Sequence, residues 1–117
     1  MTEGSAMAGA TVDIDTSSDG TLVIRPRGLL DVDDAVDLRR TVVWAIRHDR
    51  PLRLVVDLSD VHGLDPINIG TIAAACDLGD DQRVAVFLDY PSIAIADQLV
   101  TAGVPAHRLR HVGSGHD

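Results

Sequence analysis

The stretch that decides the fold is Leu54-Val-Val-Asp-Leu-Ser-Asp-Val-His-Gly-Leu-Asp-Pro-Ile-Asn-Ile-Gly70. It begins inside an apolar run from Leu52, which is typical of a strand buried on both faces. A short acidic loop follows, and Asp65-Pro66 then fits the N-cap and first position of a helix that stays apolar or small to Leu78. In α/β folds, a loop leaving the carboxyl end of a strand is where ligands and partners usually dock.

Outside this stretch, strand-like and helix-like patterns alternate along the chain. Two alternating runs flank a turn cluster and predict a hairpin, with Pro26 near a strand end or edge and Gly28 at the exit. The predicted elements are strands over 11–14 and 21–27, a helix over 31–47, a strand over 52–58, a helix over 66–78 stopped by Gly79, a strand over 84–88, a helix from Pro91-Ser92 to Gly103 and a short strand over 108–112.

The order is therefore β-β-α-β-α-β-α-β, and alternation after the hairpin predicts the α/β class. We expect a mixed, mostly parallel sheet with helices packed on it, as in a flavodoxin-like or related layer fold. At 117 residues the chain should form one domain over 11–112, with a flexible N-terminal segment over 1–10 and a flexible tail over 113–117. Function does not follow from this fold alone.

Composition excludes several classes of function. The chain has ten Arg, no Lys, seventeen Asp and one Glu, and its net charge is −8. Nucleic acid is disfavoured as a partner because its binding depends on basic side chains that neutralise phosphates. A basic patch on a protein partner suits this charge better. The lack of lysine excludes a P-loop lysine and a Schiff base, and no nucleophile–base pair stands out, so we predict that the protein is not an enzyme and expect no cofactor.

The same sequence predicts a cytoplasmic protein. No apolar run approaches the ~20 residues of a membrane span. The first ten residues lack the charged and apolar regions of a secretory signal. The single cysteine, Cys76, excludes an internal disulfide and fits a reducing compartment.

Four landmarks, in this order and spacing, make the chain resemble the STAS domain, the fold of anti-sigma factor antagonists. The landmarks, which lie within a likeness from Thr11 to Val112, are Gly28-Leu-Leu-Asp31, Leu54-Val-Val-Asp-Leu-Ser59, Leu64-Asp65 with Gly70, and Pro91-Ser92 through Leu99-Gly103. The resemblance implies a bacterial regulator of transcription whose partner is a kinase-type anti-sigma factor. In that family the unphosphorylated antagonist binds this partner and frees the sigma factor.

The chain departs from the family at the loop that carries the switch. The family loop reads Asp-Ser-Ser-Gly-Leu-Gly, and its second serine is phosphorylated by the partner. Here the loop reads Asp65-Pro66-Ile67-Asn68-Ile69-Gly70, so Ile67 occupies the acceptor position and has no hydroxyl. The resemblance therefore implies a kept architecture and a lost switch. The side chain of Ile67 could be an exposed apolar contact or could pack inward, and the sequence leaves both open.

We predict that a partner contacts residues around this loop. Thr71, one turn into the helix, is the only substitute acceptor that we consider. The predicted partner-binding residues are Asp31, Asp60, His62, Asp65, Ile67 and Asn68.

Other polar residues have simpler interpretations. The carboxylates of Asp31, Asp57, Asp60 and Asp65 could converge on a cation, but caps and solvated loop residues explain them better. His62 has no second ligand at metal spacing. His107 and His111 are four residues apart in a segment that is not helical in pattern, so no metal site is predicted. Cys76 fits a buried small residue.

Two function classes remain. The first is a divergent anti-sigma factor antagonist that binds an anti-sigma factor without serine phosphorylation. The alternative is a stand-alone STAS subunit of a transporter ATPase complex. The sequence does not indicate the oligomeric state.

Overall fold

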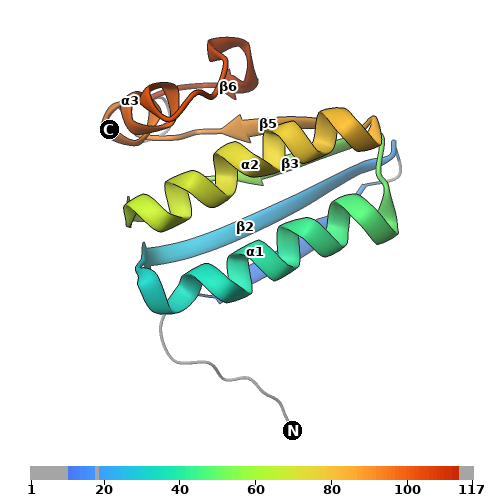
Figure 1. Cartoon of the computed structure of the whole chain (residues 1–117), viewed down its shortest axis with the longest axis horizontal. Helices are drawn as coiled ribbons and strands as arrows, with labels where there is room; N and C mark the ends of the chain where they lie inside the picture. Colours follow the sequence, from blue (N-terminus) through green and yellow to red (C-terminus); the bar gives the residue numbers. More distant parts are fainter. Residues whose placement is uncertain (1–10, 18, 114–117) are drawn as a thin grey trace, which may run out of the picture.

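One mixed sheet forms the centre of the molecule, and two long helices cross one of its faces (Figure 1). The computed structural model describes residues 11–17 and 19–113, so the predicted segment 1–10 and residues 114–117 of the predicted tail 113–117 lie outside the described part. Within that part, β1 (Thr11–Thr16) and β2 (Thr21–Leu30) form the predicted antiparallel hairpin. The sheet continues from β2 in parallel through β3 (Arg53–Asp57), β5 (Ala85–Asp89) and β6 (Leu109–Arg110). The predicted mixed, mostly parallel sheet is confirmed.

A further strand, β4 (Val61–Leu64), lies where the sequence predicts only a loop. It pairs in parallel with the end of β2, from Gly28 onward, after β2 has left β3 at Ile24. The pairing is irregular between Gly28 and Leu29, so Gly28 marks a bulge and not the end of the strand. Pro26 is buried inside β2 and not at an edge, and it lies in the interval where β2 pairs with neither β3 nor β4. A residue without a backbone N–H is tolerated in such a gap.

The helix predicted over 31–47 consists of three joined segments. A 3-10 turn (Val32–Asp34) leads into α1 (Ala35–Trp44), and a π-helical turn (Ala45–Asp49) ends it. The Asp31 carboxylate accepts a hydrogen bond from the Asp33 N–H at 2.9 Å, and the Asp31 N–H donates to the Asp34 carboxylate at 3.0 Å. This reciprocal cap satisfies donors that the start of a helix otherwise leaves unpaired.

The second helix, α2 (Pro66–Gln82), runs past Gly79, where the sequence predicts a stop. Gly79 is buried, and a Cβ atom there would lie 2.5 Å from Cγ2 of Val86 and 2.7 Å from the carbonyl oxygen of Val84. The glycine therefore allows α2 to approach β5 closely. The helix instead ends at Arg83, which has a left-handed backbone with φ of 63°. The third helix, α3 (Ile93–Thr101), begins at the predicted Ser92 cap.

The core lies between the sheet and the helices. Alternate strand residues such as Ile24, Leu54 and Val86 face it and are fully buried. The intervening residues carry ion pairs on the opposite face of the sheet. Asp15 and Asp57 both bond Arg25, at 2.8 and 3.3 Å, Asp13 bonds Arg27, and Asp89 holds Arg110 through both of its oxygens.

A buried amide joins the start of α2 to the end of β2. The side chain of Asn68 has no exposed surface, and its Nδ2 donates to the carbonyl oxygens of Leu30, at 2.9 Å, and Asp31, at 2.8 Å. The Asp65 N–H donates to the same Leu30 oxygen at 2.9 Å. These bonds fix the relative positions of β2, the first helical turn after it, and α2 at the carboxyl edge of the sheet.

We predict that Gly79→Ala destabilises the fold, because the added methyl group overlaps Val86 and the Val84 carbonyl. The expected loss in free energy of unfolding is about 1–3 kcal/mol, as for other overpacked sites. Gly70→Ala is the matched control, since a Cβ at Gly70 meets no atom within 4 Å in the same helix. The control should gain up to ~1 kcal/mol. Denaturant unfolding measures the free energy of unfolding of both variants. An equal change in the two would contradict the close approach of α2 to β5.

We also predict that Asn68→Ala lowers the free energy of unfolding by roughly 1–3 kcal/mol, the net value of two buried hydrogen bonds. The two carbonyls each keep one backbone donor, so neither is orphaned. Hydrogen exchange should rise first at the start of α2. Thr71→Ala, which removes only a bond to the Ile67 carbonyl within the helix, serves as the control. An Asn68→Ala protein as stable as that control would argue against the joining role.

Candidate protein interface

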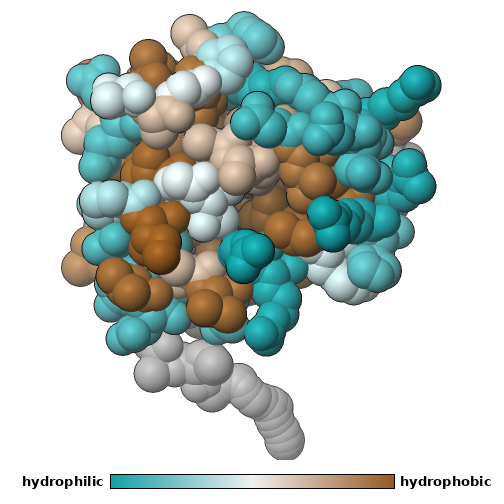
Figure 2. Space-filling model, in the orientation of Figure 1, coloured by the Kyte–Doolittle hydropathy of each residue, from teal (hydrophilic) through white to brown (hydrophobic). Residues whose placement is uncertain are grey.

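The 3-10 turn and α2 begin next to each other at one end of the molecule, and apolar side chains are exposed there. α2 contacts both the 3-10 turn and α1. Val32 is 58% exposed, Val36 61% and Ile67 50%. Figure 2 shows hydrophobic surface gathered over this end, where α1 and α2 begin in Figure 1, among hydrophilic atoms. We call Val32, Val36 and Ile67 the apolar helix end.

Ile67 is the second residue of α2, and the cap of that helix fixes its backbone. The Asp65 carboxylate accepts a hydrogen bond from the Ile67 N–H at 3.1 Å, so Asp65 caps the helix as predicted. The neighbouring Ile69 and Ile72 are 6% and 0% exposed and fill the core side of the turn. Of the two orientations left open by the sequence, the structure has the exposed one.

The predicted partner-binding residues do not all lie together. Asp31 and Asp65 are linked to the start of α2 by the hydrogen bonds described above. Asp60 and His62 instead line a neighbouring hollow of about 380 Å³, formed with Ser59, Tyr90 and Ser92. The prediction for Asn68 needs correction, because its fully buried side chain offers no surface to a partner.

The carboxylates at this end differ in their ion pairing from those on the opposite face of the sheet. Among the described residues, no ion pair involves Asp31, Asp60 or Asp65, whereas Asp57 is paired with Arg25. In the part of the chain that the structure covers, no group of three or more His, Cys, Asp and Glu could hold a metal ion. Asp31 and Asp65 act as helix caps.

The remaining candidate nucleophiles and acceptors are poorly presented. The Thr71 hydroxyl donates a hydrogen bond to the Ile67 carbonyl at 3.1 Å and is partly buried. Cys76 is buried, and burial raises the pKa of its thiol from 9.0 to about 11, so the reactive thiolate is disfavoured. The imidazole of His111 stacks on the Tyr90 ring, with centroids 4.9 Å apart.

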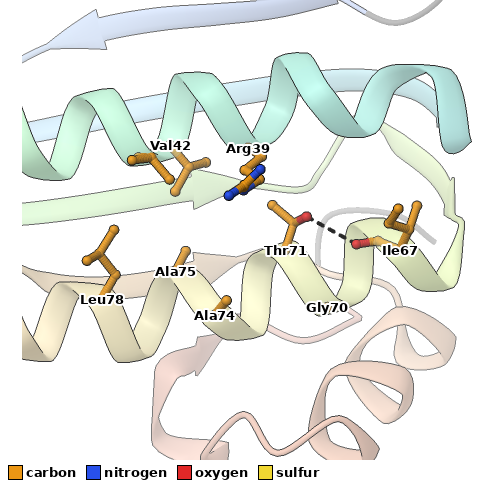
Figure 3. Close-up of a pocket in the computed structure, with 9 residues that line it drawn as sticks. Arg39, Val42, Ile67, Gly70, Thr71, Ala74, Ala75 and Leu78 are labelled. Carbon is orange, nitrogen blue, oxygen red and sulfur yellow. Dashed lines mark hydrogen bonds between the residues drawn. The ribbon is translucent and has the colours of Figure 1, made fainter.

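Sequence reasoning missed a groove between α1 and α2 that starts at Ile67. It has a volume of about 400 Å³ and is lined mainly by apolar and small side chains, with Arg39 and Thr71 as its polar members (Figure 3). Gly70 and Ala74, one turn apart on α2, were the available signal, because two small residues at this spacing leave one wall of a helix open; the structure exposes both.

Two independent comparisons place this geometry among known proteins. In sequence, residues 14–108 match the STAS domain. No curated protein matches the chain in sequence. None of the helices in the described ranges has both the length and the apolar character needed to cross a membrane.

Solved structures share the fold. An anti-sigma factor antagonist from Mycobacterium paratuberculosis is 24% identical and superposes with a TM-score of 0.72, covering 92% of this chain and 89% of its own. The phosphorylated form of the Bacillus cell fate determinant SpoIIAA is 15% identical with a TM-score of 0.72, covering 90% of this chain and 93% of its own.

Part of the murine anion transporter Slc26a9 has the same fold, at 15% identity and a TM-score of 0.63. That match covers 82% of this chain but 18% of the transporter. At these identities the likeness establishes the fold, and the sequence match extends over most of the domain. The chain belongs to the STAS domain family.

Proposed function

We propose that this protein is a regulatory binding domain that docks an anti-sigma factor through the apolar helix end, without control by serine phosphorylation. The family and the likeness to anti-sigma factor antagonists support the class of function. The observation that carries the proposal is the half-exposed side chain of Ile67 at the start of α2.

The family resemblance aligns Ile67 with the phosphorylated serine of the loop. A phosphate adds about −1.5 to −2 charges, and a helix N-terminus stabilises such an anion while the surface seen by a partner changes. The side chain of isoleucine has no hydroxyl oxygen that could accept a phosphoryl group. Its exposed side chain instead provides a permanent apolar contact, so phosphorylation at this position would not switch binding on or off.

The surroundings of Ile67 suit a partner with an apolar centre and a basic rim. Exposed Val32 and Val36 extend the apolar area, and Asp31 and Asp65 lie beside it without arginine partners among the described residues. Protein interfaces commonly place apolar residues at the centre and charged residues at the rim. Complementary charge at the rim raises the rate of association. An acidic rim of this kind would repel nucleic acid.

A second candidate function is that of a stand-alone STAS subunit in a transporter ATPase complex. The likeness to a part of the murine anion transporter Slc26a9 supports it, since the shared fold occurs there within a transporter. A pull-down from the native cell separates the two functions. An anti-sigma factor in the eluate favours the first, and a permease with its ATPase favours the second.

We predict that Ile67→Asp weakens binding to the cognate anti-sigma factor by roughly 2–4 kcal/mol, because it places a charge in an apolar contact. Titration calorimetry measures this loss. The thermal midpoint of the isolated protein should stay within about 2 °C of the wild-type value, since a half-exposed position contributes little to the core.

The matched control is Val100→Asp, a change at a 49% exposed residue of α3 outside the apolar helix end. It should leave binding unchanged. If Ile67→Asp binds as tightly as Val100→Asp does, the interface lies elsewhere. A large drop in the midpoint of Ile67→Asp would mean that Ile67 serves the core.

We also predict that the wild-type protein takes up no phosphate when incubated with a cognate kinase-type anti-sigma factor and ATP. Intact-mass measurement tests this directly. Ile67→Ser should restore partial phosphorylation if the loop keeps the family geometry, and Thr71→Val should change nothing. Phosphate on Thr71 or Ser59 of the wild-type protein would establish a switch and contradict the proposal.

A further inference from the structure

The groove between α1 and α2 has the size and lining of a small-molecule site. Its volume of about 400 Å³ falls in the range of known ligand pockets, roughly 300–1,000 Å³. Val42 on α1 and Ile67, Gly70 and Leu78 on α2 form much of its wall (Figure 3). We refer to it as the α1–α2 groove.

The groove stays open because the side chains of α2 that face it are small. A Cβ atom built at Gly70 meets nothing within 4 Å, so the space beside this residue is not filled by α1 or by any neighbouring side chain. Ala74 lies one turn further along the same wall and is also exposed. From Ile67 to Leu78 the helix rises on the order of 16 Å, so the open wall extends over about three turns. An extended chain fits this shape better than a compact ring system.

Two polar groups are available to a ligand in the groove. Arg39 lies between the two helices above Thr71 (Figure 3), and none of the ion pairs within the described residues involves it. The Thr71 hydroxyl already donates its proton to the Ile67 carbonyl. Arg39 is therefore the charged donor of the site, and a guanidinium prefers the paired oxygens of a carboxylate.

We propose that the α1–α2 groove binds an aliphatic carboxylate, with the alkyl chain along Val42, Gly70 and Leu78 and the carboxylate on Arg39. The alkyl chain of the ligand would remove the apolar wall of the groove from water, and its carboxylate would form an ion pair with the Arg39 guanidinium. A nucleotide fits less well, because the groove offers neither an aromatic ring nor a set of backbone N–H donors for phosphates. This proposal is independent of any protein partner.

The test uses the full chain and decanoate, below the concentration at which decanoate forms micelles. Titration calorimetry should give saturable binding with one site per chain. Methyl NMR shifts should change at Val42, Ile67 and Leu78 and stay constant at Ile14, which lies on β1. Absence of saturable binding, or shifts outside the groove only, would overturn the proposal.

Two pairs of variants locate the ligand. Gly70→Leu fills the groove and should abolish binding, whereas Ala94→Leu, at an exposed small residue of α3, should not. Arg39→Gln should weaken decanoate binding at least tenfold, whereas Arg40→Gln, at the next residue and outside the lining, should leave it unchanged.

Decanol, the uncharged analogue, should bind wild-type protein and Arg39→Gln equally. If Arg39→Gln and Arg40→Gln lost decanoate affinity equally, the role of Arg39 would be overturned. Unaltered binding by a folded Gly70→Leu protein would overturn the site. The Arg39 pair keeps the test decisive even if Gly70→Leu fails to fold.

Discussion

The Asn68 amide, buried at the first turn of α2, donates to the backbone carbonyls of Leu30 and Asp31. Because one side chain bonds to both carbonyls, α2 cannot shift relative to β2 without losing buried hydrogen bonds. The apolar helix end and the mouth of the α1–α2 groove both depend on that fixed relationship. The carbonyl oxygen of the Asn68 amide has no partner among the described protein atoms, so Asn68 contributes to the arrangement through its donor side.

Local signals predicted most of the fold. The Asp65-Pro66 pair, the Ser92 cap and the turn before Thr21 each act over a few residues, and the structure has a helix or hairpin at each of them. The errors have a long-range cause. Gly79 reads locally as a helix stop, but its burial against Val84 and Val86 makes it a packing residue. β4 has no alternating pattern, and it pairs with β2 on both sides of the irregularity between Gly28 and Leu29, an arrangement that depends on residues far apart in sequence.

The candidate site was less predictable for the same reason. Whether Ile67 is exposed depends on which isoleucines of α2 are buried in the core, and these are Ile69 and Ile72. Asn68 reads as a polar loop residue, whereas its burial follows from carbonyls that are distant in sequence. The groove depends on the distance between two helices, which the small residues Gly70 and Ala74 on one of them favour but do not determine.

The pairing of charges on the open face of the sheet has a consequence for how the molecule moves near other proteins. Asp57 and Asp89 are neighbours in register, yet each is bonded to its own arginine, Arg25 and Arg110, so that face contributes little net field. Among the described residues outside these pairs, carboxylates gather where the helices begin, at Asp31, Asp33, Asp34 and Asp65, whereas at the other end Arg50 and Arg83 lie close in sequence to Asp49 and Asp81. The chain thus carries its excess negative charge unevenly, toward the helix starts. In the field of a basic protein it would experience a torque before contact, and the helix starts would turn forward.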